Sequence, residues 1–594
     1  MHLRYGPLLF IPVLAIVFFV ELLLHPSWVL YSDFSGLLAY QVPQMRYLVG
    51  SWQQTGELPL WCPYTFAGMP FIHDLQVGAF YPPHLVLHCL TEELIGPALS
   101  WLIVFHVIIA GWAMYAYARC QGLNRTCAMV AACGYMFSGR WLLHLLAAGQ
   151  YVAVGLAWLP LVLLLLERSV SRGGLRFATS AGAALALVLL GSHPQFTFYA
   201  GLLIVLWTLP VALEQAGVFE PRGATGRNVP VALGRWSWAL AWSGLVALAL
   251  ALIQLLPTPE AATETTRGAS GMRSNLLAEF LFSMWGLIGP PPAGLLPTMS
   301  WEYRTGWTVL CLVTVVLAPI LVRGSLRFRL QAGVCLLLIV LGLGSAVPLQ
   351  DLLGFRLFGI PSRMFLIVTL PLALLMGTAT QALSDALRSN PGLSRTVWRL
   401  LAVVILLGLA STSSPTMLRG SLKSLDLLAY WGSLLLLLPV VVWLTYRATS
   451  AACRSSQWTG QRFQIAWGAL LLADLWAMGW PLVAVRPQAP IYAPPAYVRL
   501  LMERRGSHER VLDREVPGQC ERAPFEFALP ILLRLEQLHG YNPLDIHRYK
   551  QFIQFISDRD QPLTPGNGIG NFSLVSKTLL DLLGTRYLVM SILR

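Results

Sequence analysis

Residues 7–24 read PLLFIPVLAIVFFVELLL, and a little further on the chain reads Tyr31-Ser32-Asp33-Phe34. The hydrophobic run is long enough to span a bilayer, and no small-residue cleavage site follows it. We therefore interpret it as a retained signal anchor rather than a removed signal peptide. Arg4 precedes the run, which predicts a cytoplasmic N-terminus and puts Asp33 at the outer face of the membrane.

The composition of the whole chain is that of an α-helical polytopic membrane protein. Of its 594 residues, 56% are hydrophobic and 12% are charged, and the mean hydropathy is +0.62. A formal net charge of +13 would suggest a nucleic-acid partner if the protein were soluble. In a membrane protein the positive-inside bias explains this charge, so we expect the lipid bilayer as partner and no nucleic acid.

Hydrophobic runs recur along the chain and predict about thirteen transmembrane helices. We expect these helices at 7–24, 97–118, 126–146, 148–167, 176–191, 196–213, 236–256, 305–322, 330–347, 364–383, 399–413, 430–446 and 464–483. The arginines support this order, because the connections assigned to the inside are rich in arginine and the short outer ones are poorer. The inner arginines include Arg119, Arg125, Arg168, Arg172, Arg222, Arg235, Arg323, Arg327, Arg388, Arg399, Arg447 and Arg462.

An odd number of spans leaves the last part of the chain outside the cytoplasmic membrane. We expect a transmembrane domain over 1–483, which includes the outer loops 25–96 and 257–304, and a small extracytoplasmic α/β domain over 484–594.

Local patterns add detail to the outer segments. Residues 35–53 predict an interfacial helix in the first outer loop. In the C-terminal domain, residues 510–512 and 586–590 have the composition of strands and alternate with amphipathic helical pieces.

Nearly all unusual polar motifs fall on the side assigned to the outside. An ionisable group at membrane depth costs roughly 2.5–3.5 kcal/mol on insertion scales, so several on one face predict a site. The candidate residues are Asp33, His73, Asp74, Arg140, His144, His193, Gln195, Glu260, Glu264, Arg267 and Arg363.

Each motif also has a purely structural interpretation. Asp33 is compatible with a solvated loop aspartate, and His193, which precedes a proline, with the cap of a tight hairpin. Glu260 and Arg267 are compatible with a self-paired helix face, and Arg363 with an interfacial side chain whose charged end reaches toward water.

Motifs for nucleotide cofactors are missing. The chain has no Walker lysine motif and no dinucleotide fingerprint between a strand and a helix. An outer-face enzyme has no nucleotide pool, so its activated donor must be carried by the membrane, and a polyprenyl-phosphate sugar fits. The nine cysteines show no metal-ligand spacing, and Cys62 and Cys89 are compatible with a disulfide or with free thiols.

A succession of short motifs resembles the YfhO-like bacterial membrane proteins of the GT-C glycosyltransferase superfamily. The resemblance covers almost the whole chain in order. Its motifs are Gly56-Glu57-Leu58-Pro59-Leu60-Trp61, Gly68-Met69-Pro70-Phe71, Gly78-Ala79-Phe80-Tyr81-Pro82-Pro83, Ala157-Trp158-Leu159-Pro160, Gly191-Ser192-His193-Pro194-Gln195, Pro361-Ser362-Arg363-Met364-Phe365, Gly540-Tyr541-Asn542-Pro543-Leu544 and Leu582-Leu583-Gly584-Thr585-Arg586-Tyr587.

The resemblance implies a GT-C-like fold and transfer of a sugar from a polyprenyl-phosphate donor to a cell-envelope glycan such as lipoteichoic acid. It also implies a functional acid in the first outer loop, and Asp33 has that position. Many GT-C members have a pair of acids at this position, and no second acid stands beside Asp33. The sequence therefore does not decide whether the protein uses a divalent metal, and Asp74 is the nearest candidate for a second acid.

We therefore expect Asp33 to act as general base, with Arg363 or Arg267 holding the departing phosphate. His193 and Asp74 would orient acceptor or phosphate, and His73, Gln195, Glu260, Arg140 and His144 complete the expected substrate-binding set. Two other hypotheses remain, a transporter or flippase for lipid-linked glycans and a non-catalytic envelope-assembly protein.

Overall fold

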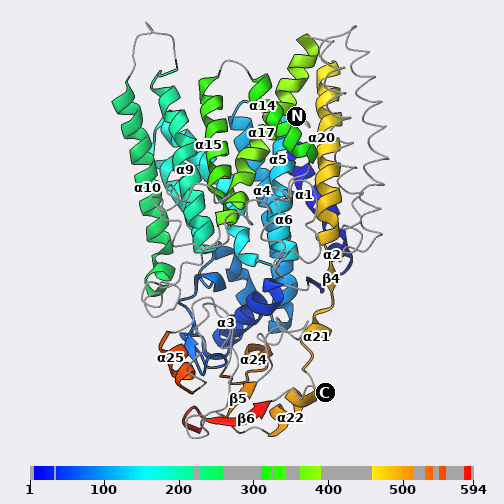
Figure 1. The fold of residues 1–594 in the computed structure, drawn as a ribbon, viewed down its shortest axis with the longest axis vertical. Helices are drawn as coiled ribbons and strands as arrows, with labels where there is room; N and C mark the ends of the chain where they lie inside the picture. The colour runs from blue at the N-terminus through cyan, green and yellow to red at the C-terminus, as the bar shows by residue number, and fades with distance from the viewer. Residues whose placement is uncertain are drawn as a thin grey trace.

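The protein is described here by a computed structural model, which is mostly helical (Figure 1). The structure describes residues 6–32, 35–219, 228–258, 309–322, 325–342, 361–389, 458–494, 496–504, 506, 509–513, 529–538, 547–556 and 581–589. Two predicted spans, 399–413 and 430–446, and most of the outer loop 257–304 lie outside these residues.

A bundle of roughly aligned helices forms the larger part of the molecule (Figure 1). Its helices are α1 (Gly6–Phe18), α4 (Ile95–Cys120), α5 (Arg125–Met136), α7 (Leu159–Arg172), α8 (Leu175–Leu190), α9 (Pro194–Gln215), α10 (Val229–Leu255), α14 (Val309–Leu321), α15 (Leu326–Gly342), α17 (Met364–Ser389) and α20 (Trp458–Gly479). The hydrophobic run 7–24 forms α1 and the short α2 (Val20–Leu24), which are separated at Phe19.

The chain is a multi-pass membrane protein. Five helical stretches among the described residues are long and apolar enough to cross a membrane: Glu92–Cys120, Tyr151–Arg172, Pro194–Gln215, Val229–Leu255 and Pro361–Leu387. Large apolar side chains also remain exposed along α10, including Leu245, Leu248 and Ile253. Apolar surface of this extent suits contact with lipid rather than with water.

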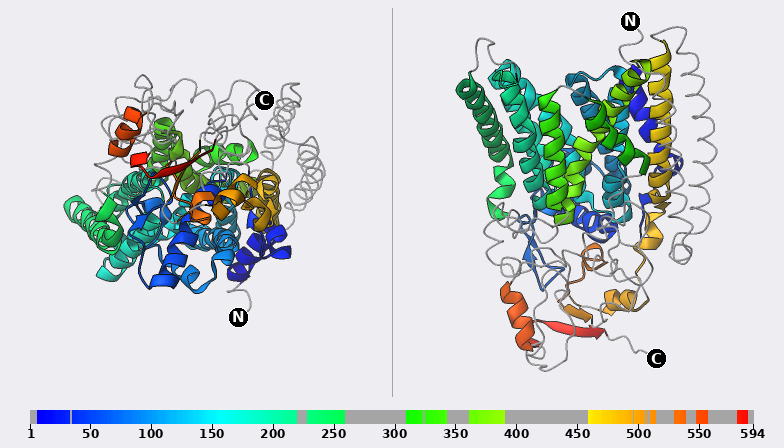
Figure 2. Two further views of the ribbon diagram at one scale, coloured as in Figure 1. Left: turned by 90° about the horizontal axis from the view of Figure 1, so that it is seen from below. Right: turned by 45° about the horizontal axis from the view of Figure 1, so that its top comes forward.

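The two ends of the bundle differ. One end, here called the loop end, carries α3 (Val42–Thr55), the rest of the first outer loop and the C-terminal elements (Figures 1 and 2). The other, here called the arginine end, is where the last turns of α4 and α7 contain Arg119 and Arg172 and where the first turn of α15 contains Arg327.

The structure differs from the prediction of two plain spans at 126–146 and 148–167. Helix α5 ends at Met136, and the chain continues through α6 (Gly139–Leu142), the π-helix η5 (Leu143–Ala147) and the 3₁₀ stretch η6 (Tyr151–Trp158) before α7. Between η5 and η6, Gly149 has a φ of +56°, and Ser35 packs so closely that a Cβ would lie 2.6 Å from its Oγ. Hydropathy does not detect such a break, because the broken segment is as apolar as a continuous helix.

Short elements cover the loop end. The helical ones are η1 (Leu37–Gln41), η2 (Leu75–Val77), η3 (Pro82–Cys89), η4 (Glu92–Leu94), η9 (Pro361–Arg363), η10 (Trp480–Leu482), α21 (Gln488–Ile491), α22 (Ala496–Arg504), α24 (Leu529–Leu532) and α25 (His547–Ile556). The predicted interfacial helix over 35–53 corresponds to η1 and α3.

Three strand pairs lie at this end, and the first and third join segments that are distant in the sequence. β1 (Val29–Leu30) is antiparallel to β4 (Val485–Arg486), and β2 (Trp61–Cys62) is antiparallel to β3 (Met69–Pro70). β5 (Arg510–Asp513) is parallel to β6 (Thr585–Val589), where the sequence predicted strands. Cys62 and Cys89 are both free thiols.

Two histidines anchor the first outer loop to the bundle. The Nε2 atom of His106 in α4 accepts from the Tyr81 hydroxyl at 2.5 Å, and the Trp158 indole donates to the same hydroxyl at 2.8 Å. His84 of η3 donates from Nδ1 to the Gly78 carbonyl at 2.8 Å, and its Nε2 accepts from the Tyr151 hydroxyl at 3.1 Å. Both rings are buried and hydrogen-bonded on both nitrogens, so the loop is fixed to α4 and η6.

This anchoring predicts a pH-dependent stability. Burial lowers the pKa of His84 to about 3, below the 6.5 of an exposed imidazole. Between these values the unfolded chain binds a proton at residue 84 that the folded chain does not, so stability falls as pH falls from about 6.5 toward 3. We expect His84→Gln to lower the Tm at pH 7 and to flatten its fall on acidification.

The measurement is thermal unfolding of the purified protein in detergent at several pH values. His25→Gln is the control, because His25 is exposed. An unchanged pH dependence in His84→Gln would show that the ring does not contribute to it.

Candidate functional site

Three segments far apart in the sequence meet around the ring of Phe196, in the first turn of α9. They are α6 with η5, the N-terminus of α9, and η9. The guanidinium carbon of Arg363 lies 5.9 Å from the Phe196 ring centroid. The rings of His193 and His144 lie 5.6 Å and 6.3 Å from it. We call this group, with Arg140 and Gln195, the Phe196 cluster.

Both arginines of the Phe196 cluster make cross-segment hydrogen bonds. Arg140 is fully buried, and its Nη2 donates to the carbonyl of Ser362 at 3.1 Å, which joins α6 to η9. Arg363 is half-buried, and its Nη1 donates to Oε1 of Gln195 at 3.2 Å, which joins η9 to α9. The amide of Gln195 in turn donates to the Tyr199 hydroxyl at 3.0 Å, which fixes the side chain that orients Arg363.

The two histidines have different tautomers. Nδ1 of His144 lies 3.1 Å from the Arg140 carbonyl, which only accepts, so this nitrogen carries the proton. Nδ1 of His193 accepts from the Gln195 backbone N–H at 3.2 Å, so here the proton is on Nε2. His193 is thus the N-cap of α9, as the hairpin-cap interpretation expected, and it also lies beside Phe196.

Three buried serines either adjoin a member of the Phe196 cluster in the sequence or are separated from one by a single residue. Ser138 precedes α6, Ser192 precedes His193, and Ser362 precedes Arg363. Their Oγ atoms have no hydrogen-bond partner within the part of the chain that the structure describes. A buried hydroxyl of this kind is unfavourable unless a ligand or water engages it. Sequence reasoning did not select these serines, because only their neighbours carry charge.

The proposed base Asp33 lies outside the described residues, but residues on both sides of it are described. Before it, the Tyr31 N–H donates to the Ala484 carbonyl at 2.8 Å, and Arg486 lies over the Tyr31 ring at 4.0 Å. After it, the Gly36 N–H donates to the carbonyl of Ala148 at 2.9 Å. Ala148 directly follows η5, which carries His144, so these flanking residues lie next to one segment of the Phe196 cluster.

Asp74 and His73 belong to the packing of the first outer loop. The Tyr40 hydroxyl donates to Oδ2 of Asp74, and the Gln76 N–H donates to Oδ1 at 2.9 Å, so Asp74 caps η2. The His73 carbonyl accepts from the Thr258 hydroxyl at 2.9 Å, and burial, partly opposed by Asp74, lowers the pKa of His73. Both carboxylate oxygens of Asp74 thus serve the loop fold.

Three predicted site residues, Glu260, Glu264 and Arg267, lie outside the described residues. Over the residues that are described, no three His, Cys, Asp or Glu side chains gather as a metal site would require. The Phe196 cluster offers guanidinium, amide and imidazole groups, which are suited to the oxygens of a phosphate.

No protein-family model matches the chain, so its likeness to the YfhO-like proteins depends on the motifs alone. No curated protein matches it.

Among solved structures, the chain is similar to ArnT from Cupriavidus metallidurans bound to undecaprenyl phosphate, with a TM-score of 0.45 and 13% identity over 90% of this chain and 86% of that one. It is also similar to the Archaeoglobus fulgidus oligosaccharyltransferase in the apo form, with a TM-score of 0.44 and 12% identity over 98% of this chain and 69% of that one. Likeness at this level assigns no function.

Proposed function

We propose that the protein is a membrane glycosyltransferase that moves a sugar from a polyprenyl-phosphate donor to a cell-envelope glycan at the outer face of the cytoplasmic membrane. The observation that carries this proposal is the Phe196 cluster. It brings two arginines, two histidines and a glutamine together at one end of a transmembrane bundle. Such a set of donors matches a phosphate whose lipid tail stays in the bilayer.

The distribution of arginine supports the orientation. Arg119, Arg172 and Arg327 lie at the end opposite to the Phe196 cluster. Because arginine-rich connections remain in the cytoplasm, the loop end then faces outward.

In the proposed reaction, the Asp33 carboxylate takes the proton of an acceptor hydroxyl while that oxygen forms a bond to the anomeric carbon of the donor sugar. The bond from this carbon to the phosphate oxygen breaks, and the electron pair leaves with the phosphate. Arg363 and Arg140 stabilise the negative charge that grows on the phosphate. Gln195 positions Arg363, and Ser362 positions Arg140 through its backbone carbonyl.

The histidines have a positioning role in this scheme. With Nδ1 protonated, the Nε2 atom of neutral His144 is an acceptor for a sugar hydroxyl, whereas the Nε2–H of His193 is a donor for a phosphate oxygen. The C-terminal domain would contribute to selecting the acceptor, because Arg534 bonds Glu92 of η4 at 3.0 Å across the loop end.

Asp33→Asn tests the general base. The substitution keeps the shape of the side chain and removes the base, so we expect transfer to fall by ~10²–10⁴-fold. The measurement is transfer of a radiolabelled sugar from a polyprenyl-phosphate donor in proteoliposomes. Asp581→Asn, at an exposed position, is the matched control. Full transfer by Asp33→Asn would remove Asp33 from the mechanism.

Arg363→Gln tests the phosphate site. Removing one charged donor from a partly buried site should weaken binding of undecaprenyl phosphate at least about tenfold. Arg363→Lys should recover only part of this loss, because lysine cannot bond two oxygens in one plane. Arg499→Gln, at an exposed position of α22, is the control. Equal affinity for undecaprenyl phosphate in the unchanged protein and the three variants would place the lipid phosphate elsewhere. Transport of the lipid-linked sugar across the membrane without sugar transfer would favour a flippase.

Reporter fusions test the orientation. Fusions at residue 225 should report the cytoplasm and fusions at the C-terminus the outside, because the arginine end contains the inner connections. A cytoplasmic C-terminus would contradict both the orientation and an outward-facing site.

A further inference from the structure

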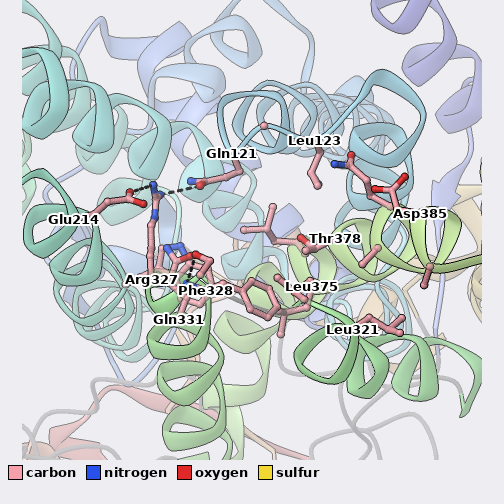
Figure 3. Close-up of a pocket in the computed structure, with 18 residues that line it drawn as sticks. Gln121, Leu123, Glu214, Leu321, Arg327, Phe328, Gln331, Leu375, Thr378 and Asp385 are labelled. Carbon is pink, nitrogen blue, oxygen red and sulfur yellow. Dashed lines mark hydrogen bonds and ion pairs between the residues drawn. The ribbon is translucent and has the colours of Figure 1, made fainter. Parts of the chain in front are cut away.

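A cavity of about 960 Å³ opens at the arginine end, away from the Phe196 cluster. Figure 3 shows the residues that line it. It lies between the ends of α4, α9 and α14, the start of α15 and the second half of α17. Its volume is in the range of cavities that hold small organic ligands.

Acidic side chains lie toward the mouth of the cavity, and large apolar side chains lie deeper in it. Glu214 and Asp385 lie near the ends of α9 and α17, whereas Trp207 and Leu375 lie deeper in the bundle. Trp207 precedes Glu214 by two helical turns, roughly 10 Å, and Leu375 precedes Asp385 by roughly 15 Å. The latter is about half the thickness of a bilayer core of ~30 Å. Acidic groups at the mouth and large apolar side chains deeper in the cavity suit an amphiphile with its head at the membrane surface.

Among the described residues, one guanidinium and two carboxyl groups form an ion-pair network at the mouth. Arg327 bonds Glu214 at 2.8 Å and Glu167 at 3.0 Å, and it also donates to Gln121 at 2.8 Å. One guanidinium is thus shared by two carboxyl groups. Glu167 is buried behind Arg327, while the Glu214 side chain is 42% exposed. Glu214 is therefore the member of this network that a ligand can reach, and its carboxylate oxygens can accept hydrogen bonds from an ammonium group.

Gln331 supplies an independent sign of a ligand deeper in the cavity. Its side chain lines the cavity and is only 6% exposed, yet its Nε2 has no hydrogen-bond partner among the described residues. Gln331 lies one turn further into the bundle than Arg327 on α15. A buried amide donor in this position requires an acceptor oxygen from whatever fills the cavity.

We propose that this cavity binds one phospholipid of the inner leaflet whose headgroup carries a primary ammonium, as in phosphatidylethanolamine. The ammonium bonds Glu214 at the mouth, a phosphate or ester oxygen accepts from Gln331, and one acyl chain lies along Trp207 and Leu375. The site is independent of the proposed glycosyl transfer, since it shares no residue with the Phe196 cluster. The leaflet follows from the orientation argued above.

The test uses the full chain, delipidated in detergent and titrated separately with three dioleoyl lipids in native mass spectrometry. Phosphatidylethanolamine should bind at least about tenfold more tightly than phosphatidylglycerol, which lacks the cation, and than phosphatidylcholine, whose ammonium has no N–H to donate. Glu214→Gln should remove this preference. Ala382→Phe, which fills the cavity from α17, should reduce binding of phosphatidylethanolamine by a similar factor. Glu503→Gln, on the exposed face of α22, should bind as the unchanged protein does.

Three results would overturn the proposal. They are equal binding of the three lipids, full retention of phosphatidylethanolamine by Ala382→Phe, and displacement of the lipid by an equal concentration of free glycerophosphoethanolamine. The last would identify a soluble zwitterion as the ligand. Ala382→Phe keeps the Arg327 network intact, so it decides the question even if Glu214→Gln lowers the yield of folded protein.

Discussion

The fully buried guanidinium of Arg140 imposes the strongest constraint on the loop end. A charge removed from water must be hydrogen-bonded, and Arg140 reaches the carbonyl of Ser362, 222 residues away in the sequence. This contact requires α6 and η9 to lie side by side. It also places Arg363 next to the N-terminus of α9, where Gln195 orients it. The Phe196 cluster therefore depends on one interaction that no short stretch of sequence contains.

Part of this arrangement could be predicted from the sequence. The topology put Arg140, His144, His193, Gln195 and Arg363 on one face, and the structure gathers them around Phe196. The break between α5 and α7 was not predicted, because hydropathy registers composition and not backbone geometry. The role of His193 as a helix cap was anticipated only as a structural alternative.

Other features depend on side-chain packing, which cannot be predicted from the type of a single residue. Asp74 was predicted as a site residue because it is an acid in the first outer loop. In the structure, Tyr40 and Gln76 donate hydrogen bonds to its two carboxylate oxygens. No sequence motif indicated the cavity at the arginine end. Residues of α9, α14, α15 and α17 and of the turn after α4 line it, and its defining properties are a shared guanidinium and a buried amide, which only the assembled bundle brings together.

The pairing of β1 with β4 has a consequence for biogenesis. Val29 and Leu30 are bonded to residues 485 and 486, so the segment that leads to Asp33 acquires its partner only after nearly all of the bundle has been synthesised. At ordinary elongation rates the interval is on the order of 20–90 s. During that time β1 lacks its partner strand. A chain whose translation stops before residue 484 would contain the described helices of the bundle but would lack β4. The segment that leads to Asp33 can therefore reach its final hydrogen-bonded form only after helix α20 has been synthesised.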